Sequence, residues 1–333
     1  MIFDCIVGNP PYNVQQNVQT VQTLYDKFVM TCKHMYPEML TMIIPSKWMF
    51  GGANLDSFRD EMLDDKHMTH LVDYFKENVF DGADIAGGVC YFLWERDKVG
   101  KCKVTTYDMY GNVFNDECYL RGDNDDTFIR IPMLRDIKNK IWSKCNTSLG
   151  TIIFNLPFKE RFPTNYFANT EDNISEQPME DSYRILGLLD QKRTYRYIKI
   201  KDAGLDIIKS YKVFIPKAYG GEQAGTFVSA WVGEPTDICT TTFMVIGYFD
   251  NKEEAENCRK YTRTKFFNCM VYTKKNSQQA HHGVYDNVPI QDFSSNSDID
   301  WNGDIASQLY KKYELTDEEI KYIEDSFREP VNE

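Results

Sequence analysis

The stretch FDCIVGNPPY, residues 3–12, joins a short apolar segment to a corner that contains two consecutive prolines. Residues 3–7 have the composition of a buried strand. Pro10 and Pro11 then remove backbone donors and exclude a helix at the point where an α/β protein usually begins one. Because open α/β sheets bind ligands at the carboxyl ends of their strands, this stiff corner lies where a ligand site is expected.

The corner offers two hydrogen-bond acceptors and one aromatic ring. The acceptors are the Asn9 side-chain oxygen and the Pro10 carbonyl, and Tyr12 supplies the ring. Such a set suits a planar base with an exocyclic amine, and an adenine extruded from a duplex fits it. Acceptance of both N6 hydrogens would make that nitrogen more tetrahedral and more reactive, by electrostatic preorganisation and not by general-base catalysis. A rigid turn with an incidental tyrosine is the alternative interpretation.

Residues 1–107 alternate between apolar strands and amphipathic helices, which predicts a parallel or mixed sheet with crossover helices. The run at residues 39–44, MLTMII, suits a strand that is buried on both faces. The other strands are expected at residues 3–7, 71–75 and 89–94, and the helices at residues 24–35 and 56–63.

The second half of the chain predicts a β-rich α+β domain. Residues 108–183 are irregular apart from one helix near residues 133–144, and we expect two domains, residues 1–150 and 151–333. Strands are expected at residues 197–200, 211–215, 226–232, 241–248 and 266–272, a helix at 252–265, and a terminal helix at 315–327 that opens with the capping box of Thr316 and Glu319.

The chain of 333 residues carries a net charge of −12, which argues against a nucleic-acid partner if the charge is evenly spread. It is not evenly spread. Residues 184–275 contain 16 Lys and Arg against 10 Asp and Glu, whereas residues 281–333 contain 4 against 13. A basic middle segment therefore remains available for nucleic acid, with an ordinary solvated surface as the alternative for either run.

Composition also bounds the class of protein. No apolar run reaches the roughly 18 residues that span a membrane, and no secretory signal is found at the N-terminus. The nine cysteines form no CxxC pair, which indicates reduced thiols in the cytoplasm. His281 and His282 are adjacent, which favours an exposed loop pair over two ligands of one metal ion, so no metal site is expected.

With these features the sequence resembles the N6-adenine-specific DNA methyltransferases, whose catalytic motif is Asn-Pro-Pro-Tyr or Asn-Pro-Pro-Phe after a sheet strand. The resemblance implies that Asn9, Pro10, Pro11 and Tyr12 are catalytic and that Phe80 packs against the flipped target base. It also implies the later strands of a Rossmann-like methyltransferase sheet, with S-adenosyl-L-methionine as methyl donor. The resemblance continues through LYDKF (residues 24–28), TMIIPSKW (41–48), GG (51–52), VFDGADI (79–85) and GGVCYFLW (87–94).

The second half is similar to the target-recognition region of adenine methylases that are fused to type II restriction enzymes or helicases. The similarity implies double-stranded DNA as a partner, a role in restriction-modification, and a prokaryotic or phage-infected host cell. It is carried by residues 261–267, 288–293, 297–301 and 309–316. The basic residues expected to contact DNA are Lys47, Arg193, Arg196, Lys199, Lys201, Arg259, Lys260, Arg263, Lys265, Lys274 and Lys275. For residues 274–279, KKNSQQ, a polar surface loop is the alternative.

The sequence lacks the cofactor-binding motif that such enzymes carry before the catalytic corner. The family places a Gly-rich turn for S-adenosylmethionine before the catalytic corner, but only eight residues precede Asn9. The glycine pairs at residues 51–52, 87–88 and 220–221 lack the form Asp-x-x-x-Gly-x-Gly. We therefore expect a second polypeptide or a missing segment to supply the cofactor-binding half, whose residues stay unassigned. A non-catalytic DNA-binding or anti-restriction protein derived from such a methylase is the alternative function.

Overall fold

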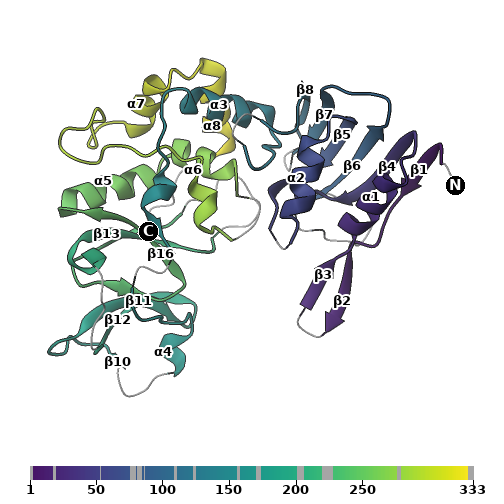
Figure 1. Cartoon of the computed structure of the whole chain (residues 1–333). Coiled ribbons are helices and arrows are strands. Elements are labelled where there is room, and N and C mark those ends of the chain that lie inside the picture. Colours follow the sequence, from purple (N-terminus) through teal and green to yellow (C-terminus); the bar gives the residue numbers. More distant parts are fainter. Residues whose placement is uncertain are drawn as a thin grey trace. The chain divides into compact units, whose positions relative to one another are not determined.

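The chain forms two compact units, Met1–Arg135 and Asp136–Glu333, in the computed structural model (Figure 1). The sequence predicts the boundary later, at residue 150. The difference arises because α3 (Pro132–Trp142) leads into the second unit, where Trp142 Nε1 donates to the Asn287 carbonyl at 3.0 Å. The structure describes residues 3–17, 20–52, 54–75, 80, 85, 87–108, 111–122, 125–155, 158–169, 174–200, 206–219, 228–275 and 279–328.

The first unit contains the mixed sheet that the sequence predicts. Its described strands follow the order β1-β4-β6-β5-β7-β8, namely β1 (Cys5–Gly8), β4 (Met39–Pro45), β6 (Val89–Glu95), β5 (Met68–Tyr74), β7 (Cys102–Tyr107) and β8 (Val113–Cys118). The pairs β1–β4 and β5–β7 are parallel, and the other neighbours are antiparallel. β7 and β8 are not among the predicted strands, since residues 102–118 are largely polar and lack a continuous apolar run.

Helices cover one face of this sheet. Leu40, Met42 and Ile44 of β4 are buried against α1 (Tyr25–His34) and α2 (Asp56–Asp64), with the short helix η1 (Ser46–Phe50) beside them. The alternate residues of β4 are only half-buried or exposed, so the prediction of a strand buried on both faces is wrong for the described chain. Three apolar side chains that the register places on that open face are exposed, namely Val7, Met39 and Tyr91.

A two-stranded hairpin follows the proline corner and projects from the first unit (Figure 1). It consists of β2 (Asn13–Asn17) and β3 (Thr20–Thr23), and the Leu24 amide closes its base by donating to the Tyr12 carbonyl at 3.0 Å. The sequence does not predict these strands, because their residues are mostly polar and carry no apolar alternation.

The second unit is β-rich, as predicted, and contains two four-stranded sheets among its described residues. One sheet has the order β10 (Ile174–Ser175), β12 (Lys192–Ile198), β11 (Tyr183–Leu189) and β15 (Ile238–Cys239). The other has the order β14 (Trp231–Gly233), β13 (Tyr211–Pro216), β16 (Phe243–Phe249) and β9 (Ile153–Phe154). β12 begins five residues before the strand expected at 197–200, and residues 226–227 of another expected strand lie outside the described ranges.

Some helices of the second unit lie beside these sheets, and others pack on one another (Figure 1). They are η2 (Leu149–Ile152), α4 (Tyr166–Asn169), η3 (Asp206–Lys209), α5 (Lys252–Thr262), α6 (Lys265–Tyr272), η4 (His282–Tyr285), α7 (Ile305–Lys312) and α8 (Asp317–Ser326). The terminal helix is confirmed together with its capping box of Thr316 and Glu319. No helix of the described ranges is long and apolar enough to cross a membrane.

The strand predicted at residues 266–272 is wrong, because α6 occupies that segment. Thr264 caps the helix by accepting from the Phe267 amide, and the residues from Phe266 to Val271 are buried around its whole circumference. A helix buried on all sides carries a continuous apolar run, which periodicity alone does not distinguish from a buried strand. The preceding Thr264 is the local signal for a helix start.

Candidate active site and nucleic-acid interface

Four segments of the first unit meet at one edge of its sheet. β1 and β4 are parallel neighbours, so the corner at residues 9–12 and the turn at residues 46–48 follow carboxyl ends at the same edge. β6 runs antiparallel to β4 and begins at this edge, directly after the glycine turn at residues 87–88. β5 also ends there, at Tyr74. The topology therefore gathers the predicted catalytic corner, the turn after β4, the start of β6 and the end of β5 at one edge of the sheet.

The corner presents an exposed amide on a fixed backbone. Asn9 is exposed directly after β1, and the side chain of Pro10 is buried beneath it. Pro11 is exposed and Tyr12 is half-buried. With the proline ring anchored in the core, the Asn9 carboxamide is held in a defined place at the edge of the sheet while its oxygen remains open to a ligand.

Tyr12 packs its ring edge-on against Tyr25, with the ring centroids 6.4 Å apart and the planes at 83°. Its hydroxyl oxygen is buried and finds no hydrogen-bond partner among the described residues. Burial raises the pKa of Tyr12, and the nearby Cys90 raises it further, so the hydroxyl stays protonated at neutral pH. The ring is thus the part of Tyr12 that the corner can use, since an unpaired buried hydroxyl is only a cost.

A buried ion pair ties the turns at this edge together. Asp73, at the end of β5, is fully buried and receives two hydrogen bonds from Arg130, at 2.5 and 2.6 Å. Ser46 Oγ donates to the same carboxylate at 2.6 Å. Arg130 also donates to the Gly87 carbonyl at 3.1 Å, and its guanidinium carbon lies 3.7 Å from the centroid of the Phe75 ring. One arginine therefore fixes the glycine turn, the end of β5 and, through Asp73, the turn after β4.

Of the remaining predicted residues of the first unit, Lys47 lies at the same edge, in the turn after β4. Phe80 is half-buried, and Lys47 is exposed with its Cβ beside Gly87. Gly88 has a φ of +81°, and a Cβ there would meet the Tyr74 carbonyl oxygen at 1.9 Å, so no other residue fits. The backbone turn that opens β6 is consequently specified by this glycine.

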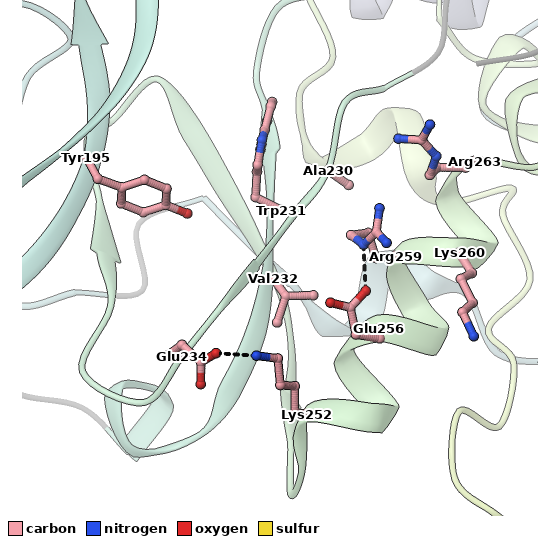
Figure 2. A pocket seen from close by; sticks show the side chains of 10 residues that line it. All are labelled: Tyr195, Ala230, Trp231, Val232, Glu234, Lys252, Glu256, Arg259, Lys260 and Arg263. Atoms are coloured by element: carbon pink, nitrogen blue, oxygen red, sulfur yellow. Dashed lines mark hydrogen bonds and ion pairs between the residues drawn. The ribbon is translucent and has the colours of Figure 1, made fainter. Parts of the chain in front are cut away.

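A hollow of about 620 Å³ in the second unit gathers part of the predicted basic set (Figure 2). Arg259, Lys260 and Arg263 line it from the end of α5, opposite Trp231 of β14. Arg193 joins them indirectly, because its guanidinium carbon lies 4.4 Å from the centroid of the Trp231 ring.

The structure does not bring the other basic residues into this hollow. Lys199 is exposed directly after the end of β12, and Lys201 lies outside the described residues. Lys275 is buried, with its Nζ 4.8 Å from the centroid of the Tyr219 ring, and its role as a DNA contact stays a prediction. The others have carboxylate partners: Arg196 with Glu176, Lys265 with Glu324 and Lys274 with Asp286.

The two adjacent histidines differ in their exposure to solvent. His281 is exposed, whereas His282 is half-buried with Nε2 2.8 Å from the Gly150 carbonyl oxygen. Within the described part of the chain, no three His, Cys, Asp or Glu residues lie close enough to hold a metal ion. All nine cysteines are free thiols.

Sequence reasoning missed four residues that shape these two places: Asp73, Arg130, Trp231 and Lys252. The spacing of Lys252, Arg259 and Arg263 in a predicted helix is a signal for one shared face, because residues three or four apart on a helix are neighbours. Asp73 and Arg130 lie 57 positions apart, and no local pattern links them.

Comparison with known proteins shows what the first part of the chain is similar to. Residues 1–80 match the family described as Eco57I restriction-modification methylase. These residues contain the corner, the turn after β4 and Phe80. The predicted resemblance to restriction-modification methylases is therefore confirmed for this part of the chain.

Individual proteins are also similar to this chain over parts of their length. An uncharacterized adenine-specific methylase of Mycoplasma pneumoniae is 32% identical over 112 residues, which cover 32% of this chain and 26% of the relative. The chain thus spans about a quarter of the length of the curated relative that it matches. Among solved structures, the type IIL restriction-modification enzyme MmeI in complex with DNA covers 98% of this chain and 55% of its own, with 12% identity and a TM-score of 0.49. The type IIG restriction endonuclease BpuSI covers 84% and 42%, with 13% identity and a TM-score of 0.33.

The described residues do not form a glycine-rich cradle of the kind that binds S-adenosylmethionine. A Cβ on Gly51 would lie 2.3 Å from Arg59 Nη1, so the space beside it is filled by the chain itself. The Gly52 amide donates to Asp56 Oδ1 at 2.9 Å. The pair at residues 87–88 packs against β5 and Arg130, and the pair at 220–221 lies outside the described residues.

Proposed function

We propose that this chain is part of a site-specific N6-adenine DNA methyltransferase of the restriction-modification type. The first unit would receive the target adenine, and the second would bind double-stranded DNA. The observation that carries the proposal is the convergence of the Asn9–Tyr12 corner with the turn after β4 and the end of β5, at one sheet edge within the residues that match the methylase family.

The corner would act by holding an extruded adenine and preparing its amine. The exposed Asn9 carboxamide oxygen and the Pro10 carbonyl accept the two N6 hydrogens, which concentrates the lone pair on nitrogen. Tyr12 and Phe80 would pack against the two faces of the base. Each stacking contact contributes about 1–3 kcal/mol, which offsets the few kcal/mol that extrusion costs.

No charged base is needed in this scheme. Burial raises the pKa of Tyr12, so its ring remains a neutral surface for the base at neutral pH. The family implies S-adenosyl-L-methionine as the methyl donor, but the described glycine turns do not fit it. We therefore derive no step through the cofactor, and we place its pocket in a partner polypeptide or a further segment.

The open face of the first sheet supports such a partner. In the described chain β1 pairs with β4 alone, and Val7 is 74% exposed next to the exposed side chains of Met39 and Tyr91. Parallel strands are usually buried on both faces, and an uncovered apolar edge favours aggregation. We infer that the cofactor-binding part covers this face and continues the sheet beyond β1.

The test is the substitution Asn9→Ala in the chain expressed with the neighbouring coding sequence of its native locus. We expect N6-methyladenine in the DNA, measured by mass spectrometry, to fall at least about 100-fold, since one preorganised hydrogen-bond partner is worth that much in a transition state. Asn13→Ala is the matched control, because Asn13 is an exposed amide four residues further on. Undiminished methylation by Asn9→Ala overturns the proposed role of the corner.

The same open face favours a second function, a non-catalytic protein that docks onto a methylase and interferes with it. In that case Asn9→Ala would leave the interference unchanged, because the corner would have no chemical task. Wild-type protein that yields no N6-methyladenine, yet lowers the methylation by a host methylase that it binds, would favour this alternative.

A further inference from the structure

The hollow beside α5 carries positive charge on a chain whose net charge is −12. We propose that this hollow binds the phosphate backbone of one DNA strand, irrespective of base sequence. The inference rests on the proposed function, because it names the part of the DNA that the second unit would hold. It adds Lys252 and Trp231 to the site and separates backbone binding here from base reading elsewhere.

The cations form a row and do not converge on one point. Lys252 begins α5 and Arg263 follows its last turn, with Arg259 and Lys260 between them. At 1.5 Å per residue the row is about 16 Å long. Phosphates on one strand advance about 3.4 Å along the duplex axis while the strand turns about that axis, so a straight row of this length meets fewer than five of them. A row suits an extended polyanion, whereas a small compact anion would need donors aimed at one centre.

Two of these cations are not neutralised by carboxylates. Lys252 pairs with Glu234 and Arg259 with Glu256, each at 2.7 Å (Figure 2). Lys260 instead donates to neutral oxygens, the Trp301 carbonyl at 2.9 Å and Asn302 Oδ1 at 3.0 Å. Arg263 has no ion pair within the described part of the chain. The row therefore keeps a net positive charge that is open to solvent.

The wall opposite α5 extends the positive surface. Trp231 stands on β14, and its ring lies under the Arg193 guanidinium at 4.4 Å. A guanidinium stacked on an aromatic face is restricted in its motion, so less entropy is lost when it meets a phosphate. Tyr195 beside it carries no charge at neutral pH, because burial raises its pKa to about 12.

The lining suits backbone binding better than base recognition. Among the described residues that line it are no Asn and no Gln, the amides that read adenine in a groove. Its polar members are cations with two carboxylates between them, and cations neutralise phosphates beside any base. The two carboxylates face the same surface and would weaken phosphate binding, so their removal should strengthen it.

The test is a fluorescence-anisotropy titration of the purified chain with two short labelled duplexes of unrelated sequence, between about 50 and 200 mM KCl. The variant is Arg259→Gln with Arg263→Gln, and the control is Lys321→Gln, an exposed lysine on α8 that is distant from this row in sequence. Glutamine is a good helix former, and circular dichroism checks that the fold is retained.

We expect the double variant to bind both duplexes about tenfold or more weakly, in equal proportion. The slope of log affinity against log salt should become shallower by about 2, because each lost phosphate contact contributes about 0.9. Glu256→Gln should bind both duplexes more tightly. The control should bind like the wild type.

Three results would overturn the proposal: unchanged affinity and slope in the double variant, weakening on one sequence only, or displacement of the duplex by inorganic phosphate or ATP at equal phosphate concentration. None of these results bears on the corner, since binding requires no methyl transfer. If Asn9→Ala loses methylation but the double variant binds DNA like the wild type, the proposed function stands and this inference alone is rejected.

Discussion

Each unit keeps its candidate site beside one buried aspartate that an arginine holds with two hydrogen bonds. At the corner edge the pair is Asp73 and Arg130, and beside the hollow it is Asp237 and Arg184, at 2.8 and 2.5 Å. The second pair supports the hollow through its lining, since the Glu234 amide donates to Asp237 and the Arg184 guanidinium lies 4.6 Å from the Tyr195 ring centroid.

The two clusters differ in charge. In the first unit one carboxylate meets one guanidinium and the charges cancel. In the second unit a further cation, Lys212, is fully buried, and its ammonium donates to the carbonyls of Ile208, Glu234 and Asp237 at 3.2–3.4 Å. Burial lowers the pKa of Lys212 to about 8, although Asp237 opposes the shift. The ion-pair cluster beside the corner is therefore neutral, whereas the cluster beside the hollow contains a lysine that titrates.

The largest expected effect comes from breaking the neutral cluster. Arg130→Met would leave Asp73 buried without its counter-charge, and we expect a loss of about 3–5 kcal/mol in the free energy of unfolding, measured by urea denaturation. Arg121→Met is the control, because Arg121 pairs with Asp60 and Asp64 at the surface, where such pairs contribute at most about 1 kcal/mol. Equal losses in the two variants would mean that Asp73 and Arg130 do not act as a buried pair.

The next effect concerns the charged cluster and its pH dependence. Burial lowers the pKa of Lys212 to about 8 in the folded chain, below its ordinary value of 10.5, so the unfolded chain binds more protons between these pH values. Stability contributed by this site therefore rises as the pH increases from 8 towards 10.5, by up to about 3 kcal/mol.

The measurement is the difference in unfolding free energy between the wild type and Lys212→Met, followed from pH 7 to pH 10. The difference removes the contribution of the buried cysteines and tyrosines, which is common to both proteins. We expect the unfolding free energy of the wild type to increase relative to that of the variant as the pH rises. A difference in unfolding free energy that does not change with pH would show that the pKa of Lys212 is the same in the folded and unfolded chains.

The smallest effect sharpens the description of the corner. Because the Tyr12 hydroxyl is buried without a partner among the described residues, Tyr12→Phe removes a desolvated group and keeps the ring. We expect unfolding free energy to stay equal or to increase by up to about 1 kcal/mol, with methylation retained within a few-fold. A substantial loss of methylation would assign the hydroxyl a role that its surroundings do not indicate.

The sequence predicts features that a single segment encodes. The corner consists of four consecutive residues after a strand, and β4 and β6 are continuous apolar runs, so each can be recognised without its neighbours in space. α6 shows the limit, since its apolar run fits a buried helix and a buried strand equally well, and only Thr264 distinguishes them.

The hollow could not be predicted as a site, because it is assembled from segments that are distant in the chain. Arg193 is on β12, Trp231 on β14 and Arg263 after α5, and their meeting depends on how two sheets and a helix pack. The same holds for Asp73 and Arg130. The sequence patterns identify more basic residues than the hollow contains. Some of them instead form ion pairs with Glu176, Glu324 and Asp286, which are distant in the sequence and give no local signal.

The central claim is a division of labour, with methyl-group chemistry at the corner and DNA-backbone binding at the hollow. One crossed measurement tests it most directly: N6-methyladenine formation and DNA affinity, both determined for Asn9→Ala and for the double variant Arg259→Gln with Arg263→Gln, in the chain expressed with its native neighbouring sequence. The account predicts that Asn9→Ala loses methylation at full DNA affinity, and that the double variant loses affinity but recovers methylation at low salt and saturating DNA. Methylation retained by Asn9→Ala, or lost by the double variant even on saturating DNA, would contradict it.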